Sequence, residues 1–508
     1  MASSGALDKS DLNEVEIADK EHSDNASPSN EEIYLSELGE QELAAFDRKM
    51  LLKLDLVLVP LMAMLYLLAW LDRANIGNAR VAGLQADLGI TDHQYQTAIT
   101  VTYVPYIVAE LPSNLLLKKI GPRILLPFLC VTWGIVTTLQ SQVHNYAGLL
   151  ACRFFLGLME GGLFPGIVLY LSVFYRRHEL QVRIALFFSA AALSGAFSGL
   201  LAAAIQQMEG IGGLRGWQWI FCLEGLFTVV FGVFAFFVLP NNPTQVKTFT
   251  PEQAAHCIER LKQDVDFTEE ERTSLTAILS VFKSPHLWLH CLQLFCSGAC
   301  LFGLAYFTPS IVQSLGSYSR THVQLLTVPP FVAAFIVTMI SSYLADYYRH
   351  RGIAALATTL LALIGIIMFY VGRTTAVRYT SLFFLITGVY ATAPSLISWV
   401  PNNSAAHVRR ATAIAMAFIW TNTGGIVSTW IFPRKDAPYY TFAAEFILAL
   451  ILISMALMVA LILLLWRYNK QKDDPIWREN ILRDVRDLSP AKQLEKLGDH
   501  HPDFKYTY

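Results

Sequence analysis

The chain has 508 residues, of which 54% are hydrophobic and 15% are charged, and its formal net charge is −2. Soluble domains average about 25% charged residues, so this composition, with a mean hydropathy of +0.42, excludes an ordinary soluble protein. The nearly neutral charge also gives no indication of nucleic acid as a partner.

The first 47 residues are rich in Asp, Glu and Ser and poor in basic side chains. A segment of this composition cannot bury a core, so residues 1–47 are predicted to form a disordered acidic tail. No basic region followed by a short apolar stretch opens the chain, which argues against a cleavable signal peptide. The tail is either regulatory or inert, and its composition favours neither.

Twelve apolar runs of roughly 20 residues follow, each long enough to cross about 30 Å of hydrocarbon as a helix. Irregular backbone cannot satisfy its polar groups in lipid. We therefore predict an all-α membrane protein with twelve transmembrane helices. The expected spans are 52–75, 94–116, 122–141, 147–171, 183–206, 217–239, 286–314, 324–345, 353–372, 379–400, 410–431 and 440–467. The weakest is 94–116, which contains Glu110 and two prolines.

A polar segment at 240–285 divides these spans into six and six. Thr250 can cap a short helix there, and Pro251 suits its first turn. The predicted organisation is a six-helix bundle at 48–239, a cytosolic linker with a short helix at 240–285, a second six-helix bundle at 286–467 and a cytosolic tail at 468–508.

The loops on the two sides of the predicted membrane differ in charge. Fifteen Lys and Arg residues lie in loops on the side of the termini, against seven on the other side. Basic loops remain in the cytosol, so both termini are predicted to be cytoplasmic. We expect a multi-pass protein of the plasma membrane, monomeric by default.

Each half places a charged loop between its second and third spans, at Pro112–Arg123 and Ser341–Gly352. Duplication of six spans is how transporters of the major facilitator superfamily are built. Both loops resemble that superfamily's motif glycine-x-leucine-alanine-aspartate-arginine, although the first loop lacks the acid. The resemblance implies a gate stabilised by charge pairs, with Glu110, Lys118, Arg123, Asp346 and Arg349 as candidate gating residues.

Glu160 lies near the middle of the fourth span, where a charge costs about 2.5–3.5 kcal/mol at a helix centre and usually faces a cavity or a partner. Arg153 is seven residues earlier, on the same helix face and about 10 Å away. A desolvated carboxyl group can bind and release a proton near neutral pH, and the guanidinium can bind a carboxylate substrate. A structural ion pair that joins this helix to a neighbour is the alternative interpretation.

Asp72 and Arg73 directly follow the first apolar run, within the sequence LDRANIGNA. An ordinary solvated helix end is one interpretation. Asn75 and Asn78 continue the polar character roughly on the face of Asp72, which instead suggests a helix that runs on and lines an aqueous cavity. The sequence around Glu160 also contains Gly157, Gly161, Gly162 and Gly166, which allow close helix packing.

Three motifs together resemble the anion:cation symporter family of the major facilitator superfamily, in particular the fungal branch with allantoate, nicotinate and pantothenate permeases. They are DRANIGNA at 72–79, RFFLGLMEGGLFPG at 153–166 and GWQWIFCLEG at 216–225. The resemblance covers about residues 50–470. It implies that Asp72 and Glu160 are the proton-coupling pair and that Arg73 and Arg153 assist substrate binding or gating.

Several other polar residues within the spans are weaker candidates. Asn75, Tyr306, Tyr390 and Asn422 can hydrogen-bond a ligand, although each alone is more typical of a contact between helices. His286 and His290 have a spacing of four residues, which suits a metal, but they lack a nearby carboxylate and the HExxH pattern. We therefore predict no metal and no cofactor, and the absence of a phosphate-binding loop gives no support for ATP as the energy source.

The sequence favours proton-coupled symport of a small organic anion by alternating access, with a carboxylate vitamin, a ureide or a related metabolite as substrate. Two alternatives use the same fold, namely an exporter or exchanger and a nutrient receptor that does not transport. The receptor is disfavoured because the tails are too short for a signalling domain. No catalytic constellation is present, so the protein is not expected to be an enzyme.

Overall fold

The computed structural model describes residues 40–265 and 279–508, apart from 349, 406, 487, 489–492 and 494–495. Most of the predicted acidic tail and the candidate gating residue Arg349 therefore lie outside the described residues. The side chain of Lys118 also lies outside them. All regular elements within the described ranges are helices.

The first half of the chain forms six spans, one of which is interrupted. They are α3 (Glu40–Val81), α5 (Asp92–Ile120), α6 (Pro122–Gln140), α7 with α8 (Tyr146–Glu160 and Leu163–Ser172), α9 (Arg177–Ile205) and α10 (Gly216–Val238). The short α4 (Leu84–Asp87) connects α3 to α5. The fourth predicted span is thus two helices, and the break follows Glu160 directly.

The second half forms six further long helices. They are α13 (Pro285–Ser314), α14 (Arg320–Tyr348), α15 (Arg351–Val371), α16 (Thr375–Asn402), α17 (His407–Ser428) and α18 (Thr441–Lys472). Each of the twelve predicted spans corresponds to one of these segments. Among the described residues, ten helices are long and apolar enough to cross a membrane. The remaining two, α5 and α17, pack against each other across the two halves.

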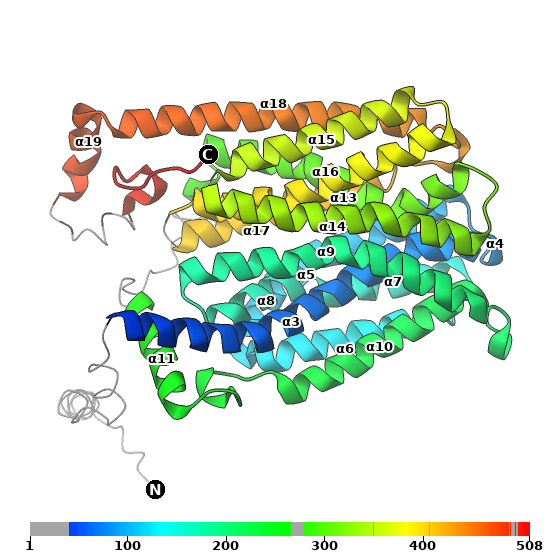
Figure 1. Cartoon of the computed structure of the whole chain (residues 1–508), viewed down its shortest axis with the longest axis horizontal. Coiled ribbons are helices and arrows are strands. Elements are labelled where there is room, and N and C mark those ends of the chain that lie inside the picture. Colours follow the sequence, from blue (N-terminus) through cyan, green and yellow to red (C-terminus); the bar gives the residue numbers. More distant parts are fainter. Residues whose placement is uncertain are drawn as a thin grey trace, which may run out of the picture.

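The two halves lie side by side as bundles of roughly parallel helices (Figure 1). They meet where α9 packs against α14, α3 against α13 and α5 against α17. We call the end where α3 begins and α18 finishes the terminal end, and the opposite end, which includes α4, the distal end. Charged and polar groups at the interface are consequently enclosed by both bundles.

Helix α3 is longer at both ends than its apolar run. At one end it continues to Val81, so that Asp72 and Arg73 are buried, with 1% and 9% of their surfaces exposed. The solvated helix end is therefore wrong for these residues. At the other end it includes residues 40–47, which the sequence assigned to the tail, and Asp47 there binds His256 of the linker at 2.6 Å.

The linker helix α11 (Pro251–Val265) packs on the terminal end of the first bundle. Thr250 caps it by accepting a hydrogen bond from the Gln253 amide. Lys53 of α3 donates to the Thr248 carbonyl at 2.9 Å and to the Gln253 side chain at 2.8 Å. These contacts attach α11 to the bundle that precedes it in the chain.

Gly498–Tyr508, which we call the C-terminal segment, folds back onto the terminal end of the second bundle. Asp499 binds Arg409 of α17 at 2.6 Å, and its Oδ2 lies 3.4 Å from His286 Nε2 of α13. Asn469 of α18 exchanges two hydrogen bonds with the Tyr506 backbone. The expectation that no carboxylate lies near His286 is therefore wrong, because a residue more than 200 positions away supplies one.

Candidate functional site

A central cavity lies between the bundles, and α3, α5, α7, α8, α13, α16 and α17 all contribute to its wall. It contains about 620 Å³ of space free of protein atoms, part of which is open to solvent. Arg73, Glu160 and Asn422 are the predicted site residues that line it. The other wall residues are mostly aromatic or aliphatic, so the cavity combines an apolar surface with a few fixed polar groups, as ligand pockets do.

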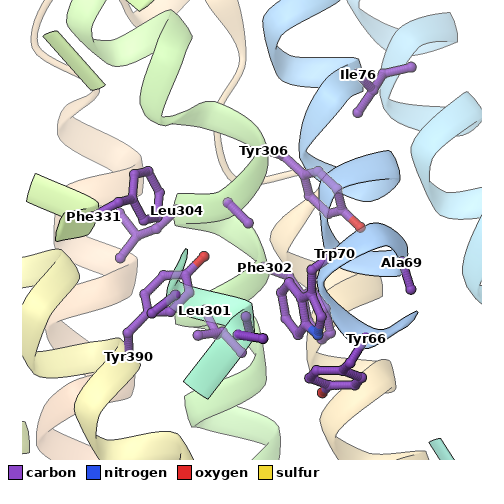
Figure 2. Close-up of a cluster of buried hydrophobic side chains, with 14 of the residues drawn as sticks. Tyr66, Ala69, Trp70, Ile76, Leu301, Phe302, Leu304, Tyr306, Phe331 and Tyr390 are labelled. Atoms are coloured by element: carbon purple, nitrogen blue, oxygen red, sulfur yellow. The ribbon is translucent and has the colours of Figure 1, made fainter. Parts of the chain in front are cut away.

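Aromatic rings from both bundles form much of this wall. Tyr66, Trp70 and Arg73 lie four and three residues apart, which places them on one face of α3. The rings of Trp70 and Phe302 are stacked at 5.3 Å and 6° (Figure 2). The sequence interpretation missed these rings, although the spacing of Tyr66 and Trp70 from Arg73 is a signal that identifies them.

Arg73 and Glu160 form an ion pair that joins α3 to α7 on the cavity wall. Arg73 Nε lies 2.7 Å from Glu160 Oε2, and the two side chains are 10% and 0% exposed. The guanidinium also lies over the Tyr106 ring, 4.6 Å from its centroid. The second oxygen of Glu160 has no hydrogen-bond partner among the described residues. The pair therefore retains an unused acceptor beside the central cavity.

Helix α7 ends at Glu160 because Gly161 and Gly162 follow it. Close packing explains the glycines: a Cβ atom on Gly157 would lie 2.0 Å from the Thr102 carbonyl oxygen of α5, and one on Gly161 would lie 2.5 Å from that of Tyr106. The predicted close helix approach is confirmed. It also positions Glu160 at the interruption between α7 and α8, beside Arg73.

Asp72 and Arg153 are fully buried behind the cavity wall. Neither carboxylate oxygen of Asp72 has a hydrogen-bond partner in the described part of the chain, and the same holds for Nε and Nη2 of Arg153. Trp133 and Thr137 of α6 are the polar neighbours of Asp72, and Arg153 is a nearby charge. Arg153 does not form the ion pair with Glu160, although the two share a helix.

Asn75 points away from the central cavity and binds a third buried acid. Its amide nitrogen donates to Glu224 Oε2 of α10. Glu224 is not among the site residues that the sequence analysis selected. The buried group formed by α3, α7 and α10 thus has three carboxyl groups, Asp72, Glu160 and Glu224, for the two guanidiniums of Arg73 and Arg153.

The two predicted tyrosines have different positions. The Tyr306 hydroxyl of α13 bonds that of Tyr103 of α5 at 2.8 Å, so it bridges the bundles. Tyr390 packs edge-on against Phe331 at 5.4 Å, across α13 from the Trp70–Phe302 stack (Figure 2). Neither tyrosine lines the central cavity. Asn422 does, and its amide nitrogen donates to the Phe418 carbonyl of its own helix.

Hydrogen bonds between the bundles close the path from the central cavity to the distal end. Gln324 of α14 donates to the Asn78 carbonyl and Arg320 to the Ala82 carbonyl, both at 3.2 Å. The hydroxyls of Thr100 and Thr429 bond at 2.7 Å. We call these three contacts the distal gate. All of them cross from one half of the chain to the other, so they break when the bundles separate at this end.

Residues 62–429 match the family described as Major Facilitator Superfamily. The chain belongs to this superfamily. A high-affinity nicotinic acid transporter of Saccharomyces cerevisiae is 34% identical over 91% of this chain and 85% of its own length. An uncharacterized transporter of Schizosaccharomyces pombe is 35% identical over 89% of each chain. The protein is therefore a multi-pass membrane transporter and not an enzyme.

Solved structures of superfamily members share the fold. A D-xylose-proton symporter aligns with a TM-score of 0.62 at 16% identity, covering 79% of this chain and 97% of the other. An inward-facing, unoccupied bacterial homologue of the human lysosomal transporter Spinster aligns with the same score at 13% identity, covering 80% and 96%. At these identities the likeness establishes the arrangement of helices alone.

The described loop residues compared with the superfamily motif pair within the second bundle or with the linker. Asp346 binds Arg351 at 2.7 Å, and Arg351 also donates to the Ser398 carbonyl of α16. Arg123 donates to the Gln245 side chain at 3.1 Å. Glu110 Oε2 is buried without a hydrogen-bond partner in the described chain. The described contacts therefore stabilise the terminal end of each half of the protein.

Proposed function

We propose that the protein carries a small organic anion together with protons across the membrane by alternating access. The Arg73–Glu160 pair on the wall of the central cavity is the observation that carries this proposal. A guanidinium is suited to bind a carboxylate through two parallel hydrogen bonds. In this structure Glu160 occupies that guanidinium in place of a substrate.

Proton binding and anion binding are coupled because both act on Arg73. Protonation of Glu160 removes its charge and weakens its hold on the guanidinium, which then binds the substrate carboxylate. With one of the three buried carboxyl groups protonated throughout the cycle, the buried charges balance when both the transported proton and the anion are bound, or when neither is. A carrier with only one of them has an uncompensated buried charge, which is costly in a low dielectric, and therefore does not rearrange.

The wall of the central cavity supports a substrate with a flat apolar body. The Arg73 guanidinium lies over the rings of Trp70 and Tyr106, and Phe302 stacks on Trp70. Aromatic pairs favour stacked or edge-on packing. The relative that transports nicotinic acid agrees with a planar carboxylate. We infer that the site binds a carboxylate vitamin or a metabolite of similar size and shape.

The loop charges support an orientation with the terminal end in the cytosol. We place the carrier in the plasma membrane. The distal gate then faces outside, and the structure is a state closed to the exterior. The fungal branch of the anion:cation symporter family is the group that best accounts for the three sequence motifs together.

The test is transport by purified protein in liposomes. A radiolabelled panel of vitamins, ureides and small carboxylates, nicotinate included, is offered with and without an inward proton gradient. Symport requires that the gradient drives accumulation of at least one compound above its external concentration. Uptake that the gradient leaves unchanged, but that an internal anion accelerates, would identify an exchanger. Binding without translocation of any compound would identify a receptor.

A further inference from the structure

A second cavity lies at the distal end, beyond the distal gate, and we call it the distal vestibule. It contains about 1020 Å³ of space free of protein atoms, part of it open to solvent. Arg80, Arg320 and Arg434 all line it, and no Asp or Glu does. Gln313 and Ser314 of α13 add hydrogen-bonding groups. Three guanidiniums in one concave space form a cationic surface that no role in the central cavity explains.

Two of the three guanidiniums are held in place by neighbouring groups. Arg80 Nη2 lies 2.9 Å from Asp92 Oδ1, and its Nε donates to the Gln85 side chain at 3.0 Å. Arg320 donates to the Ala82 carbonyl, and its ion pair with Glu209 is long, at 3.6 Å, between half-exposed side chains. An exposed pair of that length contributes little to stability, so Arg320 can exchange Glu209 for another anion at little cost.

Arg434 supplies a free charge. It lies in the single turn Arg434–Asp436 between α17 and α18, and it is exposed. Its backbone amide donates to Asp92 Oδ2 at 3.2 Å. In the described chain no ion pair or hydrogen bond involves its guanidinium. Asp92 therefore receives two side-chain donors, from Arg80 and Gln85, and one backbone donor. The three guanidiniums of the vestibule outnumber their two carboxylate partners, Asp92 and Glu209, so the vestibule retains a net positive charge.

We infer that the distal vestibule is a binding site for small organic carboxylates, which occupy it before they enter the central cavity. The binding itself follows from the three guanidiniums, because a cationic cleft with low-dielectric walls concentrates anions. The order of events rests on the proposed function. Arg80 belongs to the first bundle, whereas Arg320 and Arg434 belong to the second, so an anion between them is bound from both sides.

The same geometry links the distal vestibule to the distal gate. Arg320 is a member of both, since it reaches the Ala82 carbonyl across the bundle interface. A carboxylate is a stronger acceptor than a carbonyl for a guanidinium, so an anion in the vestibule competes for Arg320. Its arrival therefore weakens one of the three contacts that keep this end shut.

The electrostatic test uses cysteine labelling of purified protein in detergent, so that neither orientation nor transport enters the measurement. Ser314→Cys places a thiol in the distal vestibule, and Gln142→Cys places one in an exposed turn at the same end. Each reacts with an anionic ethylsulfonate and a cationic trimethylammonium methanethiosulfonate reagent. The anionic-to-cationic rate ratio is expected to be about tenfold higher at Ser314→Cys. Equal ratios would overturn the proposal.

Arg434→Gln identifies the charge responsible, with Lys435→Gln as its matched control outside the wall. Only Arg434→Gln is expected to lower the rate ratio at Ser314→Cys. Benzoate, compared with chloride at equal ionic strength, is expected to slow the labelling of Ser314→Cys and not that of Gln142→Cys. Equal effects of benzoate and chloride would show that the vestibule charges are only screened by ions in general, and would exclude a carboxylate site.

The transport consequence is measured separately in liposomes. Arg434→Gln is expected to raise the KM of uptake severalfold and to leave the maximal rate unchanged. If no proton-driven uptake exists, the labelling ratio and its protection by benzoate still hold, and only the proposed function fails. If uptake is normal but the labelling ratio matches the exposed control, only the distal vestibule proposal fails.

Discussion

Glu160 of α7 binds Arg73 of α3 at 2.7 Å, whereas Arg153, two turns earlier on its own helix, forms no ion pair with it. The contact therefore connects two helices of the first bundle at the wall of the central cavity. Removal of either charge leaves the other buried without its partner, which is costly. This cost is the physical basis for coupling between a proton and an anion.

The first prediction concerns Glu160→Gln, which permanently removes the charge that a proton would neutralise. Exchange of labelled for unlabelled substrate is expected to remain, because Arg73 is free for the anion. Accumulation driven by a one-unit pH gradient, about tenfold for one proton per anion, is expected to fall to equilibration. Accumulation at the level of the unaltered protein would show that Glu160 is not the coupling residue.

The second prediction separates the two buried arginines. Arg73→Gln is expected to weaken substrate binding by about 1.5–3 kcal/mol, or about 10- to 150-fold in Kd, because it removes a charge-assisted contact in the cavity. Arg153→Gln is expected to lower the unfolding temperature and to change Kd much less, since Arg153 does not line the cavity. Equilibrium binding of the labelled substrate gives the Kd of both variants, and equal losses of affinity would contradict the distinction.

The third prediction tests the packing beside Glu160. Gly157→Ala would place a Cβ 2.0 Å from the Thr102 carbonyl oxygen, so it is expected to destabilise the protein by about 1–3 kcal/mol through forced separation of α5 and α7. Gly216→Ala is the control, because its Cβ would meet nothing nearer than 3.4 Å. Thermal unfolding in detergent compares them, and similar midpoints would argue against this packing.

The fourth prediction uses Cys257 of α11, which lies 3.7 Å from the Phe174 carbonyl and is 1% exposed. Burial raises the pKa of its thiol to about 11, so the reactive thiolate is scarce at pH 8 and reaches half of the thiol only near pH 11. Its rate of alkylation is expected to keep rising between pH 9 and 11. The rate at Glu252→Cys, on the exposed side of α11, is expected to level off near pH 9. Matching profiles would show that α11 leaves the bundle.

The fifth prediction concerns the C-terminal segment. Asp499→Asn leaves Arg409 without its charge partner at a site where the two side chains are 2% and 10% exposed, so a loss of about 3–5 kcal/mol in unfolding free energy is expected. Asp503→Asn, at 70% exposure, is expected to change stability by less than about 1 kcal/mol. Chemical unfolding of the second bundle measures both. A negligible loss for Asp499→Asn would contradict the docking of this segment.

The sequence was sufficient for the helices because hydropathy depends on local composition. The twelve spans, the short linker helix and the continuation of α3 past its apolar run could all be predicted from residue type and spacing. The partner of Glu160 could not be, since Arg73 is 87 positions away and becomes a neighbour only when α3 and α7 pack. Spacing along one helix pointed to Arg153, whose guanidinium lies over the Phe221 ring instead.

Long-range polar contacts account for the other differences. The pairing of Asn75 with Glu224 and that of Arg409 with Asp499 each join residues whose local sequence resembles an isolated polar position or a solvated tail. Composition identifies such residues as polar, but only the packing decides whether their partner is water, a ligand or another side chain.

The terminal end has two separate attachments, α11 on the first bundle and the C-terminal segment on the second. One spin label on the exposed face of α11 and another at Asp503 would therefore each move rigidly with a different half. The distance between the two labels reports directly how far the halves rotate during a transport cycle. A pulsed electron paramagnetic resonance measurement at these two positions can follow that rotation without altering the cavity.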